Sequence, residues 1–183
     1  MFSNSYTPVK FERGAVVVMV PDGTEVELPA GTVGYITQSL GGSFTIYVEG
    51  RLFRLAGHDA DAIGREPPPR PKLPDDATDQ DVEDLIWSQL KTVYDPEIPI
   101  NVVDLGLIYD CSLVKGECGG RQVDIAMTLT APGCGMGDVL VADVRDRLKL
   151  IPTIAGVNVG LTFDPPWNQT MMSEAARLET GMF

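Results

Sequence analysis

The hydrophobic positions of this chain follow two different periods, one on each side of a proline-rich stretch. Before that stretch, short runs of β-branched or alternating apolar residues are separated by turns rich in glycine, proline and aspartate. A period of two residues is typical of half-buried strands. We therefore predict five strands in this part of the chain, at residues 15–20, 25–28, 33–38, 44–48 and 52–55.

Five short strands within about sixty residues indicate a small, strongly bent sheet or barrel. The run 31–38, followed by 44–48, resembles the pattern of an SH3-like barrel. The sequence thus predicts a small all-β domain over residues 1–64. This segment holds no cysteine and only one histidine, His58, so we expect it to carry no chemistry of its own.

Beyond residue 78 the apolar positions recur with a helical period. Thr78 is a candidate N-cap with Asp81 at the third helical position, and Asp95-Pro96 is expected to close this helix. The later elements are predicted as strands at 107–114 and 121–130, a helix at 138–150, a strand at 157–163 and a helix at 169–178. The order helix, strand, strand, helix, strand, helix indicates an α+β domain over residues 78–183, with its helices packed on one sheet.

A linker is predicted between the two domains, at residues 65–77. Five of the eight positions from 67 to 74 are proline, and Asp75-Asp76 extends the polar stretch. Proline lacks a backbone donor and favours extended polyproline geometry, so this segment is expected to act as a spacer.

The charge of the chain is strongly negative and unevenly spread. The formal net charge is −12, of which residues 1–70 contribute −2 and residues 71–183 contribute −10. Such a surface repels phosphate groups, so we expect neither nucleic acid nor an anionic membrane as a partner.

Compartment and redox state follow from simpler features. No apolar run is long enough to cross a bilayer, and the N-terminal residues lack the pattern of a secretory signal. Three cysteines, an odd number, do not suggest a disulfide framework. We therefore expect a cytoplasmic protein with reduced thiols.

The segment Thr128–Gly137 is the strongest candidate for chemistry. An alternating strand leads into a turn rich in glycine and proline that holds Cys134, and a helix is predicted directly after it. Unpaired N–H groups and the dipole at a helix N-terminus favour an anion and would stabilise a thiolate. The alternative is a small thiol that is simply buried in a tight turn.

Two other irregular segments are candidates to converge on Cys134. Residues 95–106 bring the carboxylates of Glu97 and Asp104 on backbone stiffened by prolines, and residues 164–168 bring Asp164 and Trp167. The alternative is that these prolines merely end helices and strands.

Four motifs in this order resemble the SufT/PaaD-like family of metal–sulfur cluster assembly factors. They are Asp-Pro-Glu-Ile-Pro, Val-Asp-Leu-Gly-Leu-Ile-Tyr, Thr-Leu-Thr-Ala-Pro-Gly-Cys and Asp-Pro-Pro-Trp, which together span about residues 79–180. The resemblance implies a compact α+β fold and a role in maturing iron–sulfur proteins, with the assembly machinery and client apoproteins as partners. It maps a reactive cysteine onto Cys134, the motif acids onto Glu97 and Asp104, and the terminal aspartate and tryptophan onto Asp164 and Trp167.

Ligand counting bears on whether one chain holds a cluster permanently. Clusters usually take four cysteine ligands, whereas this chain has three, without a C-x-x-C motif. Cys111 is expected in a strand and Cys118 in a glycine-rich loop, which leaves one well-placed thiol. The sequence therefore predicts transient contact with iron or an iron–sulfur cluster, at a tentative site of Cys134, Glu97 and Asp104, and a metal- or cluster-dependent homodimer.

Two other function classes stay open on the residues alone. A cysteine-dependent enzyme would need a general base near Cys134, but His58 lies outside the domain and carboxylates are weak bases for a thiol. An interaction module with a structural cysteine is the other alternative. The leading prediction is a non-enzymatic accessory factor in iron–sulfur cluster assembly.

Overall fold

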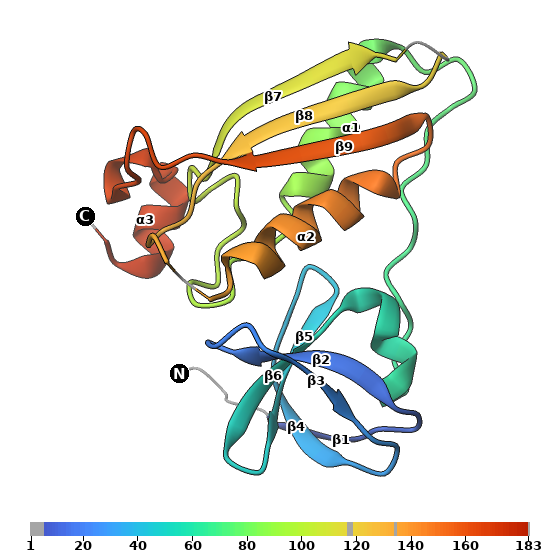
Figure 1. The fold of residues 1–183 in the computed structure, drawn as a ribbon, viewed down its shortest axis with the longest axis vertical. Helices are drawn as coiled ribbons and strands as arrows, with labels where there is room; N and C mark the ends of the chain where they lie inside the picture. Colours follow the sequence, from blue (N-terminus) through green and yellow to red (C-terminus); the bar gives the residue numbers. More distant parts are fainter. Residues whose placement is uncertain (1–5, 117–118, 134, 183) are drawn as a thin grey trace. The chain divides into compact units, whose positions relative to one another are not determined.

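The structure is a computed structural model that describes residues 6–116, 119–133 and 135–182 (Figure 1). The chain divides into two compact units between Pro69 and Arg70. The first is built on one β-sheet and the second combines helices with a smaller sheet, so the chain contains both helices and sheets, as the α+β prediction requires. In the part of the chain described, no helix has both the length and the apolar character needed to span a bilayer.

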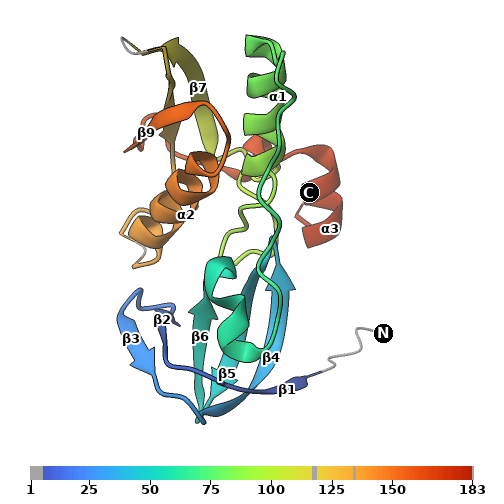
Figure 2. The same cartoon turned by 90° about the vertical axis from the view of Figure 1, so that its right-hand side faces the viewer.

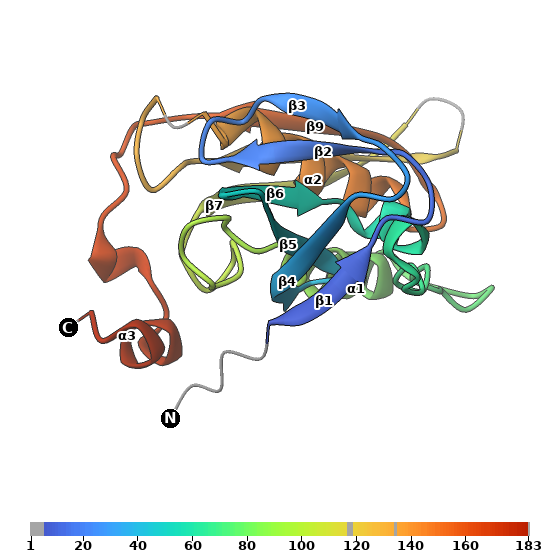
Figure 3. The same cartoon turned by 90° about the horizontal axis from the view of Figure 1, so that it is seen from below.

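The first unit is a six-stranded antiparallel sheet followed by one short helix (Figures 1 and 3). The strands pair in the order β1-β4-β5-β6-β2-β3. Their bounds are β1 Thr7–Lys10, β2 Ala15–Val20, β3 Glu25–Leu28, β4 Val33–Leu40, β5 Ser43–Val48 and β6 Arg51–Leu55, and the 3-10 helix η1 spans Gly57–Ile63.

The sheet of the first unit bends around a single core. Val9 of β1, Ile36 of β4 and Val17 of β2 belong to one buried cluster, although β1 and β2 are four places apart in the strand order. All five predicted strands are present. The sequence missed β1, because four residues that include a proline give too short an alternation, and it missed η1. The SH3-like arrangement stays a prediction.

The second unit contains a three-stranded sheet with the order β7-β8-β9. β7 and β8 form an antiparallel hairpin, while β9 runs parallel to β8 and is reached through helix α2. The bounds are α1 Asp79–Leu90, β7 Ile108–Lys115, β8 Arg121–Met127, α2 Gly137–Lys149, β9 Ile154–Leu161, η2 Gln169–Met171 and α3 Glu174–Thr180.

Both long helices pack on the same face of this sheet (Figures 1 and 2). Ile86 of α1 and Val144 of α2 share a buried cluster with the alternate β8 residues Val123, Ile125 and Met127. The opposite residues of β8 lie outside that cluster. The period-two pattern of β8 and the helical stripes of α1 and α2 therefore meet in one core.

The first helix begins as its sequence requires and ends earlier than predicted. The Thr78 hydroxyl accepts the Asp81 N–H, and the Asp81 carboxylate accepts the Thr78 N–H at 2.7 Å, which completes a capping box. The helix stops at Leu90, and Val93, predicted to be helical, is instead buried in the loop that follows. This loop, residues 91–107, carries one of the candidate segments.

The last predicted helix is two shorter ones. Met172 has extended backbone angles (φ −68°, ψ 147°), so η2 ends there. Ser173 then caps α3 with its hydroxyl, which accepts the Ala176 N–H at 3.2 Å. A serine side chain that accepts a backbone N–H favours the start of a new helix over continuation of the preceding one.

Gly106 holds the end of loop 91–107 against η2. Its φ is +73°, and a Cβ atom there would overlap the carbonyl oxygen of Met171. Because both backbone strain and overlap oppose a side chain, we predict that Gly106→Ala lowers the free energy of unfolding by about 3 kcal/mol or more. Chemical denaturation measures this. The matched control is Gly181→Ala, at φ +69° with no atom within 4 Å of the new Cβ, which should cost only about 1 kcal/mol. Equal losses of stability in the two variants would show that overlap with Met171 does not contribute.

Candidate functional site

Loop 91–107 is irregular but tightly fastened. The Val102 N–H donates to the Val93 carbonyl at 2.9 Å, and the Asp95 N–H donates to the Ile100 carbonyl at 3.0 Å. Tyr94 and Asn101 form an isolated antiparallel bridge between them. These contacts fold the loop back on itself and leave residues 96–99 at its tip.

The side chain of Asp95 shapes this tip. Its carboxylate Oδ1 accepts the N–H groups of Glu97 and Ile98, both at 2.9 Å. Asp95 is only 7% exposed, and burial raises the pKa of its carboxyl above the ordinary value of 3.8 even though the two backbone hydrogen bonds oppose the rise. A buried carboxyl of this kind is a functional-site candidate.

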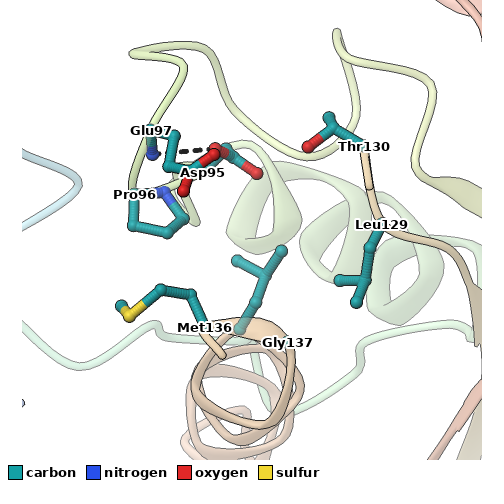
Figure 4. Close-up of a pocket in the computed structure, with 8 residues that line it drawn as sticks. Asp95, Pro96, Glu97, Leu129, Thr130, Met136 and Gly137 are labelled. Atoms are coloured by element: carbon teal, nitrogen blue, oxygen red, sulfur yellow. Dashed lines mark hydrogen bonds between the residues drawn. The ribbon is translucent and has the colours of Figure 1, made fainter. Parts of the chain in front are cut away.

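The tip of the loop lines a small pocket together with the end of β8 and the start of α2 (Figure 4). Its volume is about 10 Å³, near the minimum that holds one water molecule. The lining residues are Asp95, Pro96 and Glu97 from the loop, Leu129 and Thr130 after β8, and Met136, Gly137 and Leu140 at α2. Two of the three predicted segments thus meet here.

Cys134 lies outside the described residues. Its chain neighbours Gly133 and Gly135 are both exposed, and the buried Met136 is the N-cap residue of α2. Met136 offers no side-chain acceptor to the first N–H groups of this helix. The side chain of the N-cap residue therefore does not cap the helix start beside the pocket. Backbone N–H groups without such a cap, at the N-terminus of a helix, favour an anion.

The two predicted acids are in different surroundings. Glu97 is exposed and lines the pocket. Asp104 is half-buried, accepts the Asn101 side-chain amide at 2.6 Å, and is not among the pocket residues. Asn101 in turn accepts the N–H groups of Val103 and Asp104, so this carboxylate belongs to the turn at the far end of the loop.

The third predicted segment contacts the loop away from the pocket. The indole Nε1 of Trp167 donates to the Leu105 carbonyl at 2.7 Å, and the Tyr109 hydroxyl donates to the Pro165 carbonyl at 2.8 Å. Asp164 is exposed, and its N–H donates to the Thr162 hydroxyl. The structure places Asp164 and Trp167 outside the pocket lining, and Trp167 packs against the main core.

Sequence reasoning did not single out Asp95 or Thr130. The sequence pattern places Asp95 at the end of the first helix and at the start of the Asp-Pro-Glu-Ile-Pro motif, but it gives this side chain no role at the site. The signal that could identify Asp95 is an aspartate directly before a proline at a turn. Aspartate side chains in such turns accept the N–H groups of the residues two and three positions later.

The described residues contain no group of three or more histidine, cysteine, aspartate or glutamate side chains placed to hold a metal ion. Cys111 is half-buried in β7, and burial, followed by the charges of Glu83 and Asp110, raises the pKa of its thiol to about 11. It is therefore a poor thiolate at neutral pH.

Comparison with known proteins places these features in a family. The pattern of the iron–sulfur cluster assembly protein family matches residues 83–161, which include Glu97, Asp104 and position 134. An Fe-S protein maturation auxiliary factor of Porphyromonas gingivalis is 49% identical over 102 residues, which are 56% of this chain and 92% of that protein. The chain belongs to the iron–sulfur cluster assembly protein family.

A second named relative agrees on the extent of the match. The Fe-S protein maturation auxiliary factor SufT of Staphylococcus aureus is 37% identical over 91 residues, which are 49% of this chain and 98% of that protein. A solved domain of unknown function from Bacillus anthracis is 31% identical, with a TM-score of 0.48, and the match covers 57% of this chain and 95% of that one. The two named relatives are thus matched almost entirely by about one hundred residues of this chain.

The buried carboxyl of Asp95 makes a testable contribution to stability. Because the pKa of this group is raised in the folded protein, the folded state binds its proton more tightly than the unfolded state. The stabilisation is therefore complete below the unfolded pKa and is lost as the pH rises through the folded pKa. We predict that Asp95→Asn, which keeps an oxygen acceptor for the Glu97 and Ile98 N–H groups, removes this loss.

The measurement is the free energy of unfolding of both proteins as a function of pH. The difference between Asp95→Asn and the wild-type chain should grow in favour of the variant from about pH 4 toward neutrality. The exposed Asp76→Asn is the control and should leave the pH dependence unchanged. If Asp95→Asn instead lowers the free energy of unfolding by the same amount at every pH, burial of the Asp95 charge does not determine the pH dependence.

Proposed function

We propose that this protein is an accessory factor in the maturation of iron–sulfur proteins and that it acts through a reactive thiol at Cys134. The observation that carries the proposal is the near-complete match to relatives that bear the name Fe-S protein maturation auxiliary factor. The family pattern covers the pocket and the turn that holds position 134 in the sequence.

The chemistry of the pocket supports a thiolate nearby. The N-terminus of α2 carries backbone N–H groups that no side chain of Met136 caps, and the turn precedes it by two residues. Such a helix end lowers the pKa of an adjacent thiol. The carboxylates of Glu97, which lines the pocket, and of Asp138, in the first turn of α2, oppose that effect. The proposed outcome is a modestly activated thiol.

This ligand set favours transfer over storage. One thiolate and the carboxylate of Glu97 leave most of a cluster's coordination unfilled, and Cys111 is a poor additional ligand. A scaffold, a client apoprotein or a second chain would supply the remainder. We therefore assign this protein a transient cargo of iron or an iron–sulfur cluster, with no catalytic turnover of its own.

The remaining candidate residues act, in this proposal, by positioning. Asp95 orients Glu97 through the turn at residues 96–98, and Trp167 fastens the loop at Leu105. Asp104 belongs to the same fastening through Asn101. Asp164, which is exposed at the end of the third segment, is a candidate contact for a partner protein.

The first test is anaerobic addition of iron and sulfide to the purified chain, followed by visible absorption and iron quantification. We predict that the wild-type chain gains cluster absorption at less than one cluster per chain and forms cluster-dependent dimers. Cys134→Ser should lose both properties, and Cys111→Ser, the matched control, should keep them. A Cys134→Ser variant that binds as well as the wild type would exclude this mechanism, and so would a monomer that holds a full cluster.

Thiol reactivity is an independent test. Limited labelling with iodoacetamide at neutral pH, mapped by mass spectrometry, should modify Cys134 well before Cys111, because the pKa of Cys111 is raised to about 11. Cys118, like Cys134, lies outside the described residues. Preferential labelling of Cys111 or Cys118 would show that the turn does not activate its thiol.

A further inference from the structure

Among the residues that the structure describes, the two sheets have four edge strands, which differ in how their edges are protected. β1 carries Pro8 and Lys10, β3 carries two glutamates, and β7 carries Asp110 and Lys115. Proline and charged side chains are the usual means by which proteins prevent edge-to-edge pairing. β9, at the other edge of the second sheet, is eight residues long and has neither. Its bulge lies at the start, between Ile154 and Gly156, and leaves the rest of the strand regular.

The backbone of β9 is available along its free side. The Thr162 N–H donates to the Met127 carbonyl at 2.9 Å, so the even-numbered residues of β9 direct their backbone groups toward β8. From Gly156 onward the register is regular, so the N–H and C=O groups of Val157, Val159 and Leu161 point away from the sheet. A register shift between Ile154 and Gly156 places Ala155 in a bulge at the start of the strand. Within the residues that the structure describes, these outward groups have no hydrogen-bond partner.

We propose that β9 is the surface through which two copies of this chain pair, edge to edge and antiparallel, in a dimer that needs no metal. The pairing does not depend on the proposed function. A two-fold axis at Asn158 places this residue opposite Asn158 of the second copy. It also places Val157 opposite Val159 of the second copy, so that the outward N–H and C=O groups of these two residues satisfy one another.

The side chains at this edge suit a second copy. Next to Asn158 on the open face of the sheet lie Gly156 and Gly160, which leave room for a neighbouring strand. No charged side chain of β9 faces another across the axis, in a chain whose net charge is −12. Leu161 and Phe163, which are 38% and 44% exposed, lie at the end of the strand, where the start of the second copy's β9 would cover them.

Symmetry favours this occupant over the other edges of the same protein. Pairing of β9 with a different strand edge of another copy is heterologous, whereas pairing of β9 with itself is isologous and closes after two chains. The contact is limited to one strand edge, so the dissociation constant should be on the order of micromolar.

The test is sedimentation velocity of the full chain over a concentration series, in chelator and reductant so that no metal or disulfide contributes. The wild-type chain should show a monomer–dimer equilibrium. Asn158→Lys and Asn158→Glu each place like charges opposite one another on the axis, so each should raise the dissociation constant about tenfold or more. A one-to-one mixture of the two variants should restore dimers as a mixed species, because the charges are then opposite.

The matched control is Ser112→Lys. Ser112 pairs with Asp124 on one side of β8, and Asn158 pairs with the same Asp124 on the other side. The control therefore introduces the same charge in the same row of the open face, but on β7, and it should dimerise like the wild type.

Three results would overturn the proposal. One is a wild-type chain that stays monomeric up to millimolar concentration, which would mean that another segment or protein covers this edge. The second is an Asn158→Lys variant that dimerises as well as Ser112→Lys. The third is a mixture of the two charge variants that stays monomeric. Dimers that form only with iron and sulfide would support the proposed function, but they would not support the metal-independent pairing of β9.

Discussion

The arrangement of the second unit depends on how loop 91–107 satisfies its own backbone. This loop joins α1 to β7 without helix or strand, yet Val93, Ile100 and Val102 are buried in the main core. Buried N–H groups need partners, and here they find them in the paired carbonyls of the loop and in the carboxylate of Asp95. Because that carboxylate is itself buried, the turn at residues 96–98 has a fixed shape. Glu97 is thereby held beside the start of α2, which is the basis of the pocket.

Regular elements followed from local signals, and irregular ones did not. The capping box at Thr78 and the alternation of β8 each carry their own evidence in the chain, and both appear within a few residues of the predicted bounds. The end of α1 at Leu90 and the break at Met172 depend on tertiary packing, which no local period reports. β1 is held in place by its pairing with β4, a contact between segments about 25 residues apart.

At the candidate site, too, the residue types could be predicted from the sequence, whereas their contacts could not. Residue type and motif order were sufficient to name Glu97 and to direct attention to the turn of Cys134. They could not show that Asp104 bonds to Asn101 or that Trp167 donates to Leu105, since both contacts depend on how the loop folds back. Asp95 was missed for the opposite reason. Its local motif is readable, but its burial, which raises the pKa of its carboxyl, is a property of the folded core.

The extent of the family match separates what is shared from what is particular to this chain. About one hundred residues account for 98% of the Staphylococcus aureus relative and 92% of the Porphyromonas gingivalis relative, which leaves little room in either for a second domain. The six-stranded unit is therefore an addition relative to these two proteins. It has its own core and carries little of the net charge, since residues 71–183 hold −10 of the −12. The negative charge is therefore concentrated in the unit that matches the iron–sulfur cluster assembly protein family, and an acidic surface attracts cations.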